Sequence, residues 1–344
     1  MSEQSMNAAI WIGDNAVETV SVPWPEVKPG WAVVEVAYNG ICGTDLSILH
    51  GKHPRAKTGL TMGHELSGYV VKSGEGGPEV GALVVAEPLI SCGKCGACDS
   101  GASHVCKNLG LYGIDAPGAL AEYVSLPFSV LHSVPVSVDA KLAALVEPLA
   151  VAVHAVEQAE VQPGDKVVIA GGGPVGVLTA LVAQHEGAGQ IILSEPSATR
   201  RAIAKKYGFT VVEDGESVAE VALRETDGEG VDIFFDTAGH PSVTVDYTTA
   251  TRVLGRIVVV GVHKVPAAID LRDVCFKELD IRGVRVYTTE NVRIAIALIA
   301  SKEIDLTEFP IAVFSLSNVA QAFEKAGSGE DVLKVMVTPE GEKK

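Results

Sequence analysis

Short hydrophobic runs and the residues that separate them divide the chain into three parts. In residues 8–90, apolar and polar positions alternate over short stretches such as 31–38 and 66–71, with proline and glycine between them. Alternation with a period of two predicts half-buried strands joined by turns. The first part is therefore expected to form an all-β unit.

The middle part, from residue 166 onward, alternates strand-like runs with stretches of helical periodicity. The expected strands cover 166–170, 190–194, 210–212, 231–236 and 256–260, and the expected helices cover 174–186, 197–207, 217–226 and 241–253. This alternation is typical of a parallel sheet with right-handed helical crossovers. The fold class is therefore predicted to be α/β, with a doubly wound domain.

The final part of the chain mixes the two patterns. Helices are expected at 289–301 and 316–326, and a strand at 331–337. That strand has no evident partner in its own neighbourhood. It is therefore expected to return to the sheet of the first part.

Length and charge exclude several classes of function. The chain has 344 residues, enough for two domains, and carries 43 acidic residues against 27 lysines and arginines, a formal charge of −16. Such a field repels nucleic-acid phosphates and anionic lipids, so nucleic acid and membranes are not expected as partners.

The N-terminus lacks a signal-peptide pattern, and the best apolar stretch, 142–159, is interrupted by Glu147, Pro148, His154 and Glu157. A cytoplasmic location is expected.

A glycine-rich turn follows the first strand of the middle part. Residues 171–176 read Gly-Gly-Gly-Pro-Val-Gly, a G-x-G-x-x-G pattern between a strand and a helix. The glycines permit a tight turn and a close approach of pyrophosphate to the helix N-terminus. The residues expected to bind the dinucleotide here are Gly171, Gly173, Pro174, Val175 and Gly176. An ordinary glycine turn is the alternative reading.

An acidic residue ends the second strand of the same part. Glu195 stands where a carboxylate can bind both ribose hydroxyls and repel a 2′-phosphate. This position favours NAD over NADP as the cofactor. Arg200, also expected to bind the cofactor, and Arg201 follow closely and leave some NADP use open, and a solvated strand-end glutamate is the other interpretation.

Four cysteines lie within fifteen residues. Cys92, Cys95, Cys98 and Cys106 can close a tetrahedral zinc shell with no open position, which indicates a structural zinc. An iron–sulfur cluster is disfavoured because the run does not continue as x3-C-P. His104 could replace one ligand, and a zinc ribbon that binds nucleic acid is disfavoured by the acidic charge.

A second and looser set of metal-ligand types is spread along the chain. It comprises Cys42, the pair His64 and Glu65, and Glu147. Three protein ligands and one open position define a catalytic zinc site. Each residue alone has another explanation: a core cysteine, a buried histidine, or a glutamate in the first turn of a helix.

Together these motifs resemble the zinc-dependent medium-chain dehydrogenase/reductase superfamily over essentially the whole chain. The segment 63–74 is similar to its zinc signature, the four-cysteine lobe to its structural zinc, and 171–176 with Glu195 to its cofactor domain. The segment 147–154 resembles the polyol and diol branch, which includes sorbitol, butanediol and threonine dehydrogenases. The resemblance implies a GroES-like catalytic domain at 1–148 and 285–344, with the cysteine lobe at about 91–107, and a Rossmann domain at 149–284.

The resemblance also implies roles for single residues. Cys42 and His64 would bind the catalytic zinc, Glu65 and Glu147 would ligate it directly or through water, and Asp45 would orient His64. Thr44 would hydrogen-bond the substrate oxygen and begin a proton relay. Ser47 stands where many relatives have the histidine that ends this relay, and serine is a poor base. His50, His53 or solvent would have to replace it.

The resulting expectation is an enzyme with NAD and two zinc ions per subunit, one catalytic and one structural. It would oxidise a secondary alcohol of a vicinal diol or small polyol to a ketone by hydride transfer. A threonine or amino-alcohol dehydrogenase is the alternative, which Ser47 disfavours, and a non-catalytic nucleotide-binding relative is another. Cys42 and His64 oppose a zinc-free quinone or enoyl reductase. The resemblance implies a homotetramer or homodimer.

Overall fold

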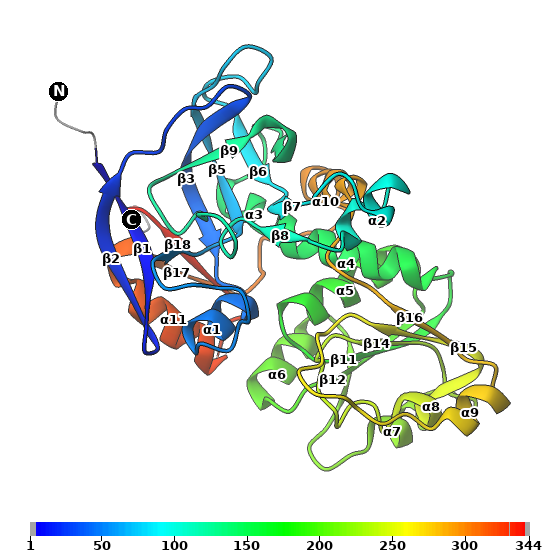
Figure 1. The fold of residues 1–344 in the computed structure, drawn as a ribbon. Coiled ribbons are helices and arrows are strands. Elements are labelled where there is room, and N and C mark those ends of the chain that lie inside the picture. The colour runs from blue at the N-terminus through cyan, green and yellow to red at the C-terminus, as the bar shows by residue number, and fades with distance from the viewer. Residues whose placement is uncertain (1–4, 330, 341–344) are drawn as a thin grey trace. The chain divides into compact units, whose positions relative to one another are not determined.

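The computed structural model describes residues 5–329 and 331–340 and separates the chain into two compact units. The first unit contains the chain up to Glu147 and from Thr288 onward, and the second contains Pro148–Tyr287. Figure 1 shows both ends of the chain, blue and red, in the first unit, and the green to yellow middle of the chain in the second. The first unit is therefore discontinuous in sequence.

The first unit is built on a seven-stranded sheet. Its strands, in spatial order, are β10 (Leu131–Ser133), β6 (Leu83–Ala86), β5 (Glu65–Lys72), β3 (Trp31–Gly40), β18 (Lys334–Thr338) and β17 (Ile311–Ser315), with β9 (Tyr123–Pro127) also paired to β3. Alternate valines and leucines of these strands, among them Val34, Val70 and Leu126, form a buried core. The period-two pattern of the sequence thus places one face of each strand inward.

Two smaller sheets complete the β structure of this unit. One contains β2 (Ala16–Pro23), β1 (Ser5–Gly13) and β4 (Leu60–Thr61), and the other β7 (Leu89–Ile90) and β8 (Gly110–Leu111). The final strand β18 pairs with β3 at Met336↔Gly40 and Val337↔Asn39, which confirms its expected return. It also pairs in parallel with β17, so a nearby partner exists after all.

The first unit also contains helices, most of them short. They are α1 (Gly43–Leu49), α2 (Gly96–Asp99), α3 (Ala140–Ala143), α10 (Thr289–Ser301) and α11 (Val319–Ser328), with 3-10 turns at Ser103–Val105, Phe128–Val130 and Leu316–Asn318. Helix α11 is amphipathic and packs Val319 and Phe323 into a core with Trp11, Ile48 and Val335. The helix α4 (Val146–Ala159) begins in the first unit and continues into the second.

The second unit is a doubly wound α/β domain. Its six strands are all parallel, in the order β13 (Thr210–Val212), β12 (Gln190–Ser194), β11 (Lys166–Ala170), β14 (Val231–Asp236), β15 (Thr251–Val259) and β16 (Asp280–Gly283). Its helices are α5 (Pro174–His185), α6 (Ala198–Lys206), α7 (Val218–Glu225), α8 (Tyr247–Ala250) and α9 (Leu271–Phe276). Strand order reverses beside β11, where such sheets bind ligands at their carboxyl ends.

One expected element of this unit is wrong. The predicted helix at 241–253 is a series of turns followed by the single-turn helix α8, and β15 begins at Thr251. Threonine and valine dominate this stretch, and β-branched residues favour strands and turns over helix interiors. In addition, the Thr244 hydroxyl donates to the carbonyls of Pro241 and Ala268, which holds the turn.

Among the described residues, no helix is long and apolar enough to cross a membrane.

Candidate active site

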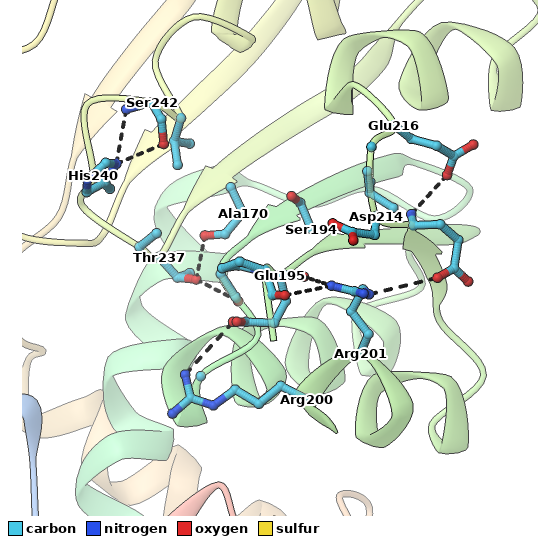
Figure 2. A pocket seen from close by; sticks show the side chains of 18 residues that line it. Ala170, Ser194, Glu195, Arg200, Arg201, Asp214, Glu216, Thr237, His240 and Ser242 are labelled. Atoms are coloured by element: carbon cyan, nitrogen blue, oxygen red, sulfur yellow. Dashed lines mark hydrogen bonds and ion pairs between the residues drawn. The ribbon is translucent and has the colours of Figure 1, made fainter. Parts of the chain in front are cut away.

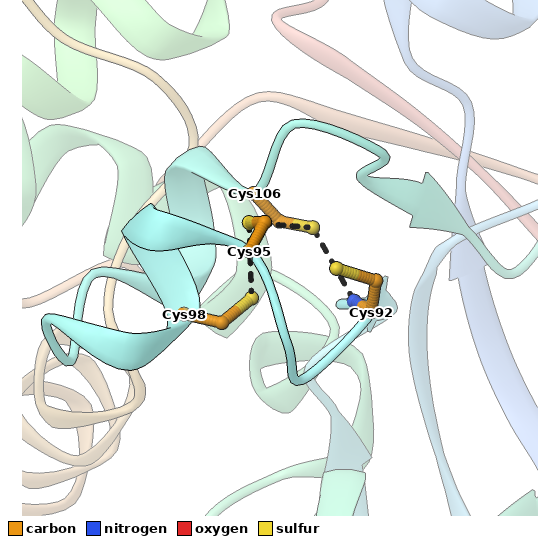
Figure 3. Close-up of side chains that lie close together, drawn as sticks. All are labelled: Cys92, Cys95, Cys98 and Cys106. Carbon is orange, nitrogen blue, oxygen red and sulfur yellow. Dashed lines mark hydrogen bonds between the residues drawn. The ribbon is translucent and has the colours of Figure 1, made fainter.

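The four cysteines predicted to bind a structural zinc converge in space (Figure 3). Their sulfur atoms all lie within 4.8 Å of one another. The Sγ atoms of Cys95 and Cys98 are 3.6 Å apart, and those of Cys95 and Cys106 are 3.9 Å apart. Four ligands at the Zn–S bond length of about 2.3 Å place neighbouring sulfurs at about 3.8 Å. The lobe therefore fits a closed zinc site.

Backbone amides lower the pKa of two of these cysteines, Cys95 and Cys106. Cys106 Sγ accepts hydrogen bonds from the N–H groups of Cys92 and Asn108, both at 3.3 Å. The N–H groups of Cys98 and Lys107 lower the pKa of Cys95 to about 6. Since the thiolate is the form that binds metal, this lobe carries a ready ligand at neutral pH.

The structure also brings together Cys42, His64 and Glu65. Cys42 directly precedes α1, Glu65 begins β5, and His64 stands immediately before it. One ligand atom of each lies within 4.8 Å of the others, and His64 and Glu65 are buried. A thiol, an imidazole and a carboxylate are the ligand types of catalytic zinc. The donor set therefore fits a zinc ion held by three protein ligands.

Asp45 lies behind His64, as predicted. Its Oδ2 accepts from the Cys42 N–H at 2.9 Å, and its Oδ1 is 3.6 Å from His64 Nδ1. Asp45 Oδ1 and His64 Nδ1 are buried and have no hydrogen-bond partner among the described residues. With Nδ1 facing the carboxylate, Nε2 is the ring nitrogen of His64 that is left for a metal.

The negative charges near His64 raise the pKa of its imidazole. Burial lowers the pKa of His64, but the Asp45 carboxylate and the Cys42 thiol outweigh burial and hold this pKa well above its ordinary value. For the acid Asp45 burial has the opposite effect: it raises the pKa, and the nearby His64 only partly offsets this rise. Because a ligating imidazole must be neutral, metal binding to this site displaces a proton.

Lys334 is a member of this group that sequence reasoning missed. It is buried in β18, and its Nζ lies 2.7 Å from both carboxylate oxygens of Glu65. Burial lowers the pKa of Lys334, but Glu65 and Cys42 more than compensate and raise it above its usual value. A single lysine among the apolar residues of 332–337 was the signal in the sequence.

A glycine makes room for this ion pair. A side chain at Gly40 on β3 would collide with the Glu65 carboxylate. The close approach of β3 to Glu65 thus depends on glycine at this one position.

Three other residues predicted for this site, Glu147, Thr44 and Ser47, are not part of the Cys42–His64–Glu65 group. Glu147 is outside the group of ligand atoms within 4.8 Å, although its charge raises the pKa values of His64 and Lys334. Thr44 lies in the first turn of α1 and is half-buried. The Ser47 hydroxyl donates to the Gly43 carbonyl at 3.1 Å, within its own helix.

Two histidines follow α1 in a strongly basic segment, 50–57. The Nδ1 atom of His50 is 2.6 Å from the Leu46 carbonyl, so it carries the proton and Nε2 is left as a base. In His53, Nδ1 accepts from the N–H groups of Arg55 and Ala56. Burial, Arg55 and, more weakly, His64 lower the pKa of His53. This segment is therefore within electrostatic reach of the Cys42–His64–Glu65 group.

A cavity of about 690 Å³ lies in the second unit at the carboxyl ends of its strands (Figure 2). The predicted residues Gly171, Gly173, Glu195 and Arg200 line it. Pro174, Val175 and Gly176 are in the first turn of α5 but are not among its lining residues. The cavity has the position expected of a dinucleotide site in this class of sheet.

The glycine turn is shaped for a close ligand. A Cβ at Gly176 would collide with the Gly171 carbonyl, and Gly171 itself has a φ of +112°. At Gly173, by contrast, a Cβ would meet only Arg200 Nη1, at 3.9 Å. Gly173 is the N-cap of α5 and provides no side-chain cap. The bare helix N-terminus fits a phosphate group.

Glu195 is buried at the edge of this cavity. Its two carboxylate oxygens accept hydrogen bonds from the N–H groups of Gly172 at 2.8 Å and Ser197 at 2.9 Å. Arg200 Nη1 approaches one of these oxygens to 3.9 Å. Arg201 instead donates to the carbonyls of Glu195 and Pro196, so it stabilises the turn after β12.

Other residues of the cavity were missed. Thr237, His240 and Ser242 line it from the loop after β14, and Glu213, Asp214 and Glu216 from the loop after β13. Neither loop contains a binding motif, so the sequence alone predicts no ligand for them. Their position after parallel strands was the signal.

A group of residues with the ligand types of catalytic zinc and a doubly wound domain with a dinucleotide cavity define the class: a zinc-dependent nicotinamide dehydrogenase. Residues 28–136 match the family model described as an alcohol dehydrogenase GroES-like domain, and residues 174–301 match that of a zinc-binding dehydrogenase. These matches confirm the predicted GroES-like and Rossmann domains.

Individual relatives cover nearly the whole chain. A 2-dehydro-3-deoxy-L-galactonate 5-dehydrogenase from Pseudoalteromonas atlantica is 38% identical over 96% of this chain and 98% of its own length. An L-threonine 3-dehydrogenase from Pyrococcus horikoshii is 38% identical over 78% of this chain and 79% of its own length. The structure of 2R,3R-butanediol dehydrogenase from Bacillus subtilis matches with a TM-score of 0.89 at 29% identity, over 97% of this chain and 100% of the other.

The chain therefore belongs to the zinc-dependent medium-chain dehydrogenase/reductase superfamily, in its polyol and diol branch. It is an enzyme that uses zinc and a nicotinamide dinucleotide to act on a small alcohol.

Proposed function

We propose that this enzyme uses NAD to oxidise a secondary alcohol of a vicinal diol or small polyol to a ketone. The observation that carries the proposal is the convergence of Cys42, His64 and Glu65 in one buried group. When bound there, zinc would supply a Lewis acid that lowers the pKa of the substrate hydroxyl, and NAD would accept the hydride. Glu147 is proposed as a further ligand, direct or through water.

The protein itself would receive the proton of the substrate hydroxyl. Thr44, in the first turn of α1, is proposed to accept it first. Ser47 cannot end the relay because its hydroxyl is bonded within the helix and serine is a poor base. The Nδ1 atom of His50 contacts a carbonyl, which leaves Nε2 as the nitrogen that can accept a proton, whereas the Nδ1 atom of His53 already accepts two N–H groups. We therefore favour His50, exposed to water, as the outer base.

The basic segment 50–57 supports a more specific candidate, a polyol that carries a carboxylate. This segment contains no acidic residue in a chain of charge −16, and it includes His50, Lys52, His53, Arg55 and Lys57. Arg55 is bonded to Asp115 through two contacts, at 2.9 and 3.0 Å, while Lys52 and Lys57 are exposed. The relative from P. atlantica is named for a sugar acid, which agrees with this candidate.

The deciding experiment is NADH formation by the zinc-loaded enzyme over a panel of alcohols. The panel contains the 2,3-butanediol stereoisomers, glycerol, sorbitol, xylitol, matched aldonates and L-threonine. Turnover of diols or neutral polyols would support the main proposal, and at least a tenfold preference for an aldonate over its neutral polyol would support the sugar-acid candidate. Exclusive oxidation of L-threonine, the substrate in the name of the P. horikoshii relative, would overturn both.

Glu195→Ala is expected to change the cofactor preference. The carboxylate is proposed to bind the ribose hydroxyls of NAD, and hydrogen bonds to a charged group are strong enough that the Kd for NAD should rise about tenfold or more. Loss of the negative charge should also improve the relative use of NADP. Steady-state kinetics with both cofactors will measure this.

Glu195→Gln is the matched control for the backbone contacts of this side chain. It keeps an oxygen that can accept from Gly172 or Ser197 but removes the charge. If the charge decides the preference, both variants will shift the NAD to NADP ratio of kcat/KM in the same direction. An unchanged ratio in both would show that Glu195 does not select the cofactor.

We also propose that the enzyme is a homo-oligomer. Strand β16 is an edge strand of the parallel sheet, and the neighbouring Leu271 and Phe276 are 72% and 78% exposed. An exposed edge with apolar neighbours is a site for pairing between chains. Sedimentation is expected to give a dimer or tetramer, and Phe276→Glu should weaken it. A monomeric wild-type enzyme would contradict this proposal.

A further inference from the structure

Asp236, the last residue of β14, receives six hydrogen bonds in the second unit. Its side chain is fully buried. Oδ1 accepts from the N–H groups of Ala238 and Gly239 at 3.0 and 2.8 Å. Oδ2 accepts from the Tyr247 hydroxyl at 2.6 Å and from His263 Nε2 at 2.7 Å, since a carboxylate can only accept. The backbone carbonyl accepts from Val260 and Gly261, both at 2.8 Å.

These contacts join two loops that are far apart in sequence. One loop follows β14 and contains Ala238 and Gly239, and the other follows β15 and contains Gly261 and His263. The loops also touch backbone to backbone, because a Cβ at Gly239 would lie 2.7 Å from the Gly261 carbonyl carbon. Gly239 has a φ of +61°, which favours glycine further. Asp236 thus holds both loops in one arrangement.

The loop after β14 is one wall of the dinucleotide cavity. Thr237, Ala238 and His240 line it together with Gly171 and Gly173, and Figure 2 shows Thr237 and His240 among the lining side chains. The Thr237 hydroxyl donates to the carbonyls of Ala170 and Gly171 at 2.9 and 3.1 Å. A displacement of this loop would therefore change the cavity and the glycine turn together.

Tyr247 and His263 provide the two side-chain hydrogen bonds to the Asp236 carboxylate. Tyr247 is buried, and burial together with Asp236 raises the pKa of its hydroxyl far above the usual range, so it stays a neutral donor. The His263 side chain is 17% exposed, and its Nδ1 has no hydrogen-bond partner among the described residues. Neither residue lines the cavity. Tyr247 and His263, which belongs to the loop after β15, each contact the loop after β14 through Asp236.

We propose that Asp236, held by Tyr247 and His263, is a positioning residue that sets the loop after β14 for binding of the nicotinamide dinucleotide. This inference rests on the dinucleotide site of the proposed function. Loss of either donor leaves the carboxylate free to shift, and the loop shifts with it. The effect should appear in cofactor affinity more than in the chemical step, because none of the three side chains belongs to the zinc site.

The test is direct binding of NAD and NADH to zinc-loaded Tyr247→Phe and His263→Ala, together with steady-state kinetics. Each variant is expected to raise the Kd for the cofactor about tenfold, while kcat at saturating cofactor changes less than threefold. His263→Gln retains a side-chain N–H donor and should restore most of the affinity. The double variant should lose less than the product of the two single effects, because both act through one carboxylate.

Tyr207→Phe is the matched control, since it removes the hydroxyl of another tyrosine in this unit that does not line the cavity. If Tyr247→Phe does not fold, the His263→Ala and His263→Gln pair decides, because that side chain is partly exposed. Variants that melt earlier but bind cofactor like wild type would overturn the positioning role. A wild-type enzyme that binds neither NAD nor NADP would overturn the proposed function instead.

Discussion

Cys42→Ser is expected to lower kcat/KM about a thousandfold and to remove one of two zinc ions per chain. Cys42 supplies the only thiol of the Cys42–His64–Glu65 group, and its loss leaves a weak hydroxyl ligand. Lewis-acid activation contributes several kcal/mol to such reactions, and each 1.36 kcal/mol corresponds to about a tenfold change in rate. Zinc analysis and steady-state kinetics on the same preparation will measure both losses.

Cys275→Ser is the control for this substitution. Cys275 is exposed and lies outside both groups of metal-ligand residues in the described part of the chain, so this variant should keep two zinc ions and full activity. A Cys42→Ser enzyme with both zinc ions and wild-type kinetics would show that the catalytic zinc is elsewhere. Loss of both zinc ions would instead point to a general loss of structure, which a melting curve would reveal.

Lys334→Met is expected to destabilise the protein by about 3–5 kcal/mol, the range measured when one partner of a buried ion pair is removed. Methionine has a similar length but leaves the buried Glu65 carboxylate without its partner at 2.7 Å. Urea unfolding without added zinc, so that metal binding by Glu65 does not enter the comparison, will measure the change in the free energy of unfolding.

Two further variants separate the charge from the shape of the lysine. Lys325→Met removes a partly exposed lysine whose contact with Asp331 is 3.9 Å, and surface pairs contribute about 0–1 kcal/mol. The double variant Lys334→Met/Glu65→Gln removes both buried charges and should recover part of the lost stability. If Lys334→Met is no more destabilising than Lys325→Met, the buried ion pair does not stabilise this unit.

The sequence predicted those parts of the fold in which local pattern and chemistry agree. Strands at 166–170, 190–194, 210–212 and 231–236 coincide with β11 to β14, because apolar runs between helical stretches leave few other arrangements. The four-cysteine lobe was equally readable, since its ligands lie close together in the chain. Cys42 and His64, by contrast, were readable from the sequence only as part of a loose set of ligand types, and their separate roles came from the family resemblance.

The features that the sequence did not reveal depend on contacts between distant segments. Lys334 is 269 residues from Glu65, and no local rule joins a lysine in the last strand to a glutamate in an early one. Likewise, Asp236 and His263 meet only because β14 and β15 are neighbours in the sheet. The expected helix at 241–253 failed for the same reason, because pairing with β14 took Thr251 into a strand.

The discontinuous first unit has a consequence for synthesis on the ribosome. Chains emerge from their N-terminus, and domains fold as they become available. The second unit is continuous from Pro148 to Tyr287 and can fold as soon as it has emerged. The sheet that carries Cys42 and His64 has to wait for β18, which brings Lys334 to Glu65. A transcript truncated near its 3′ end would therefore yield an intact cofactor domain without a finished metal site.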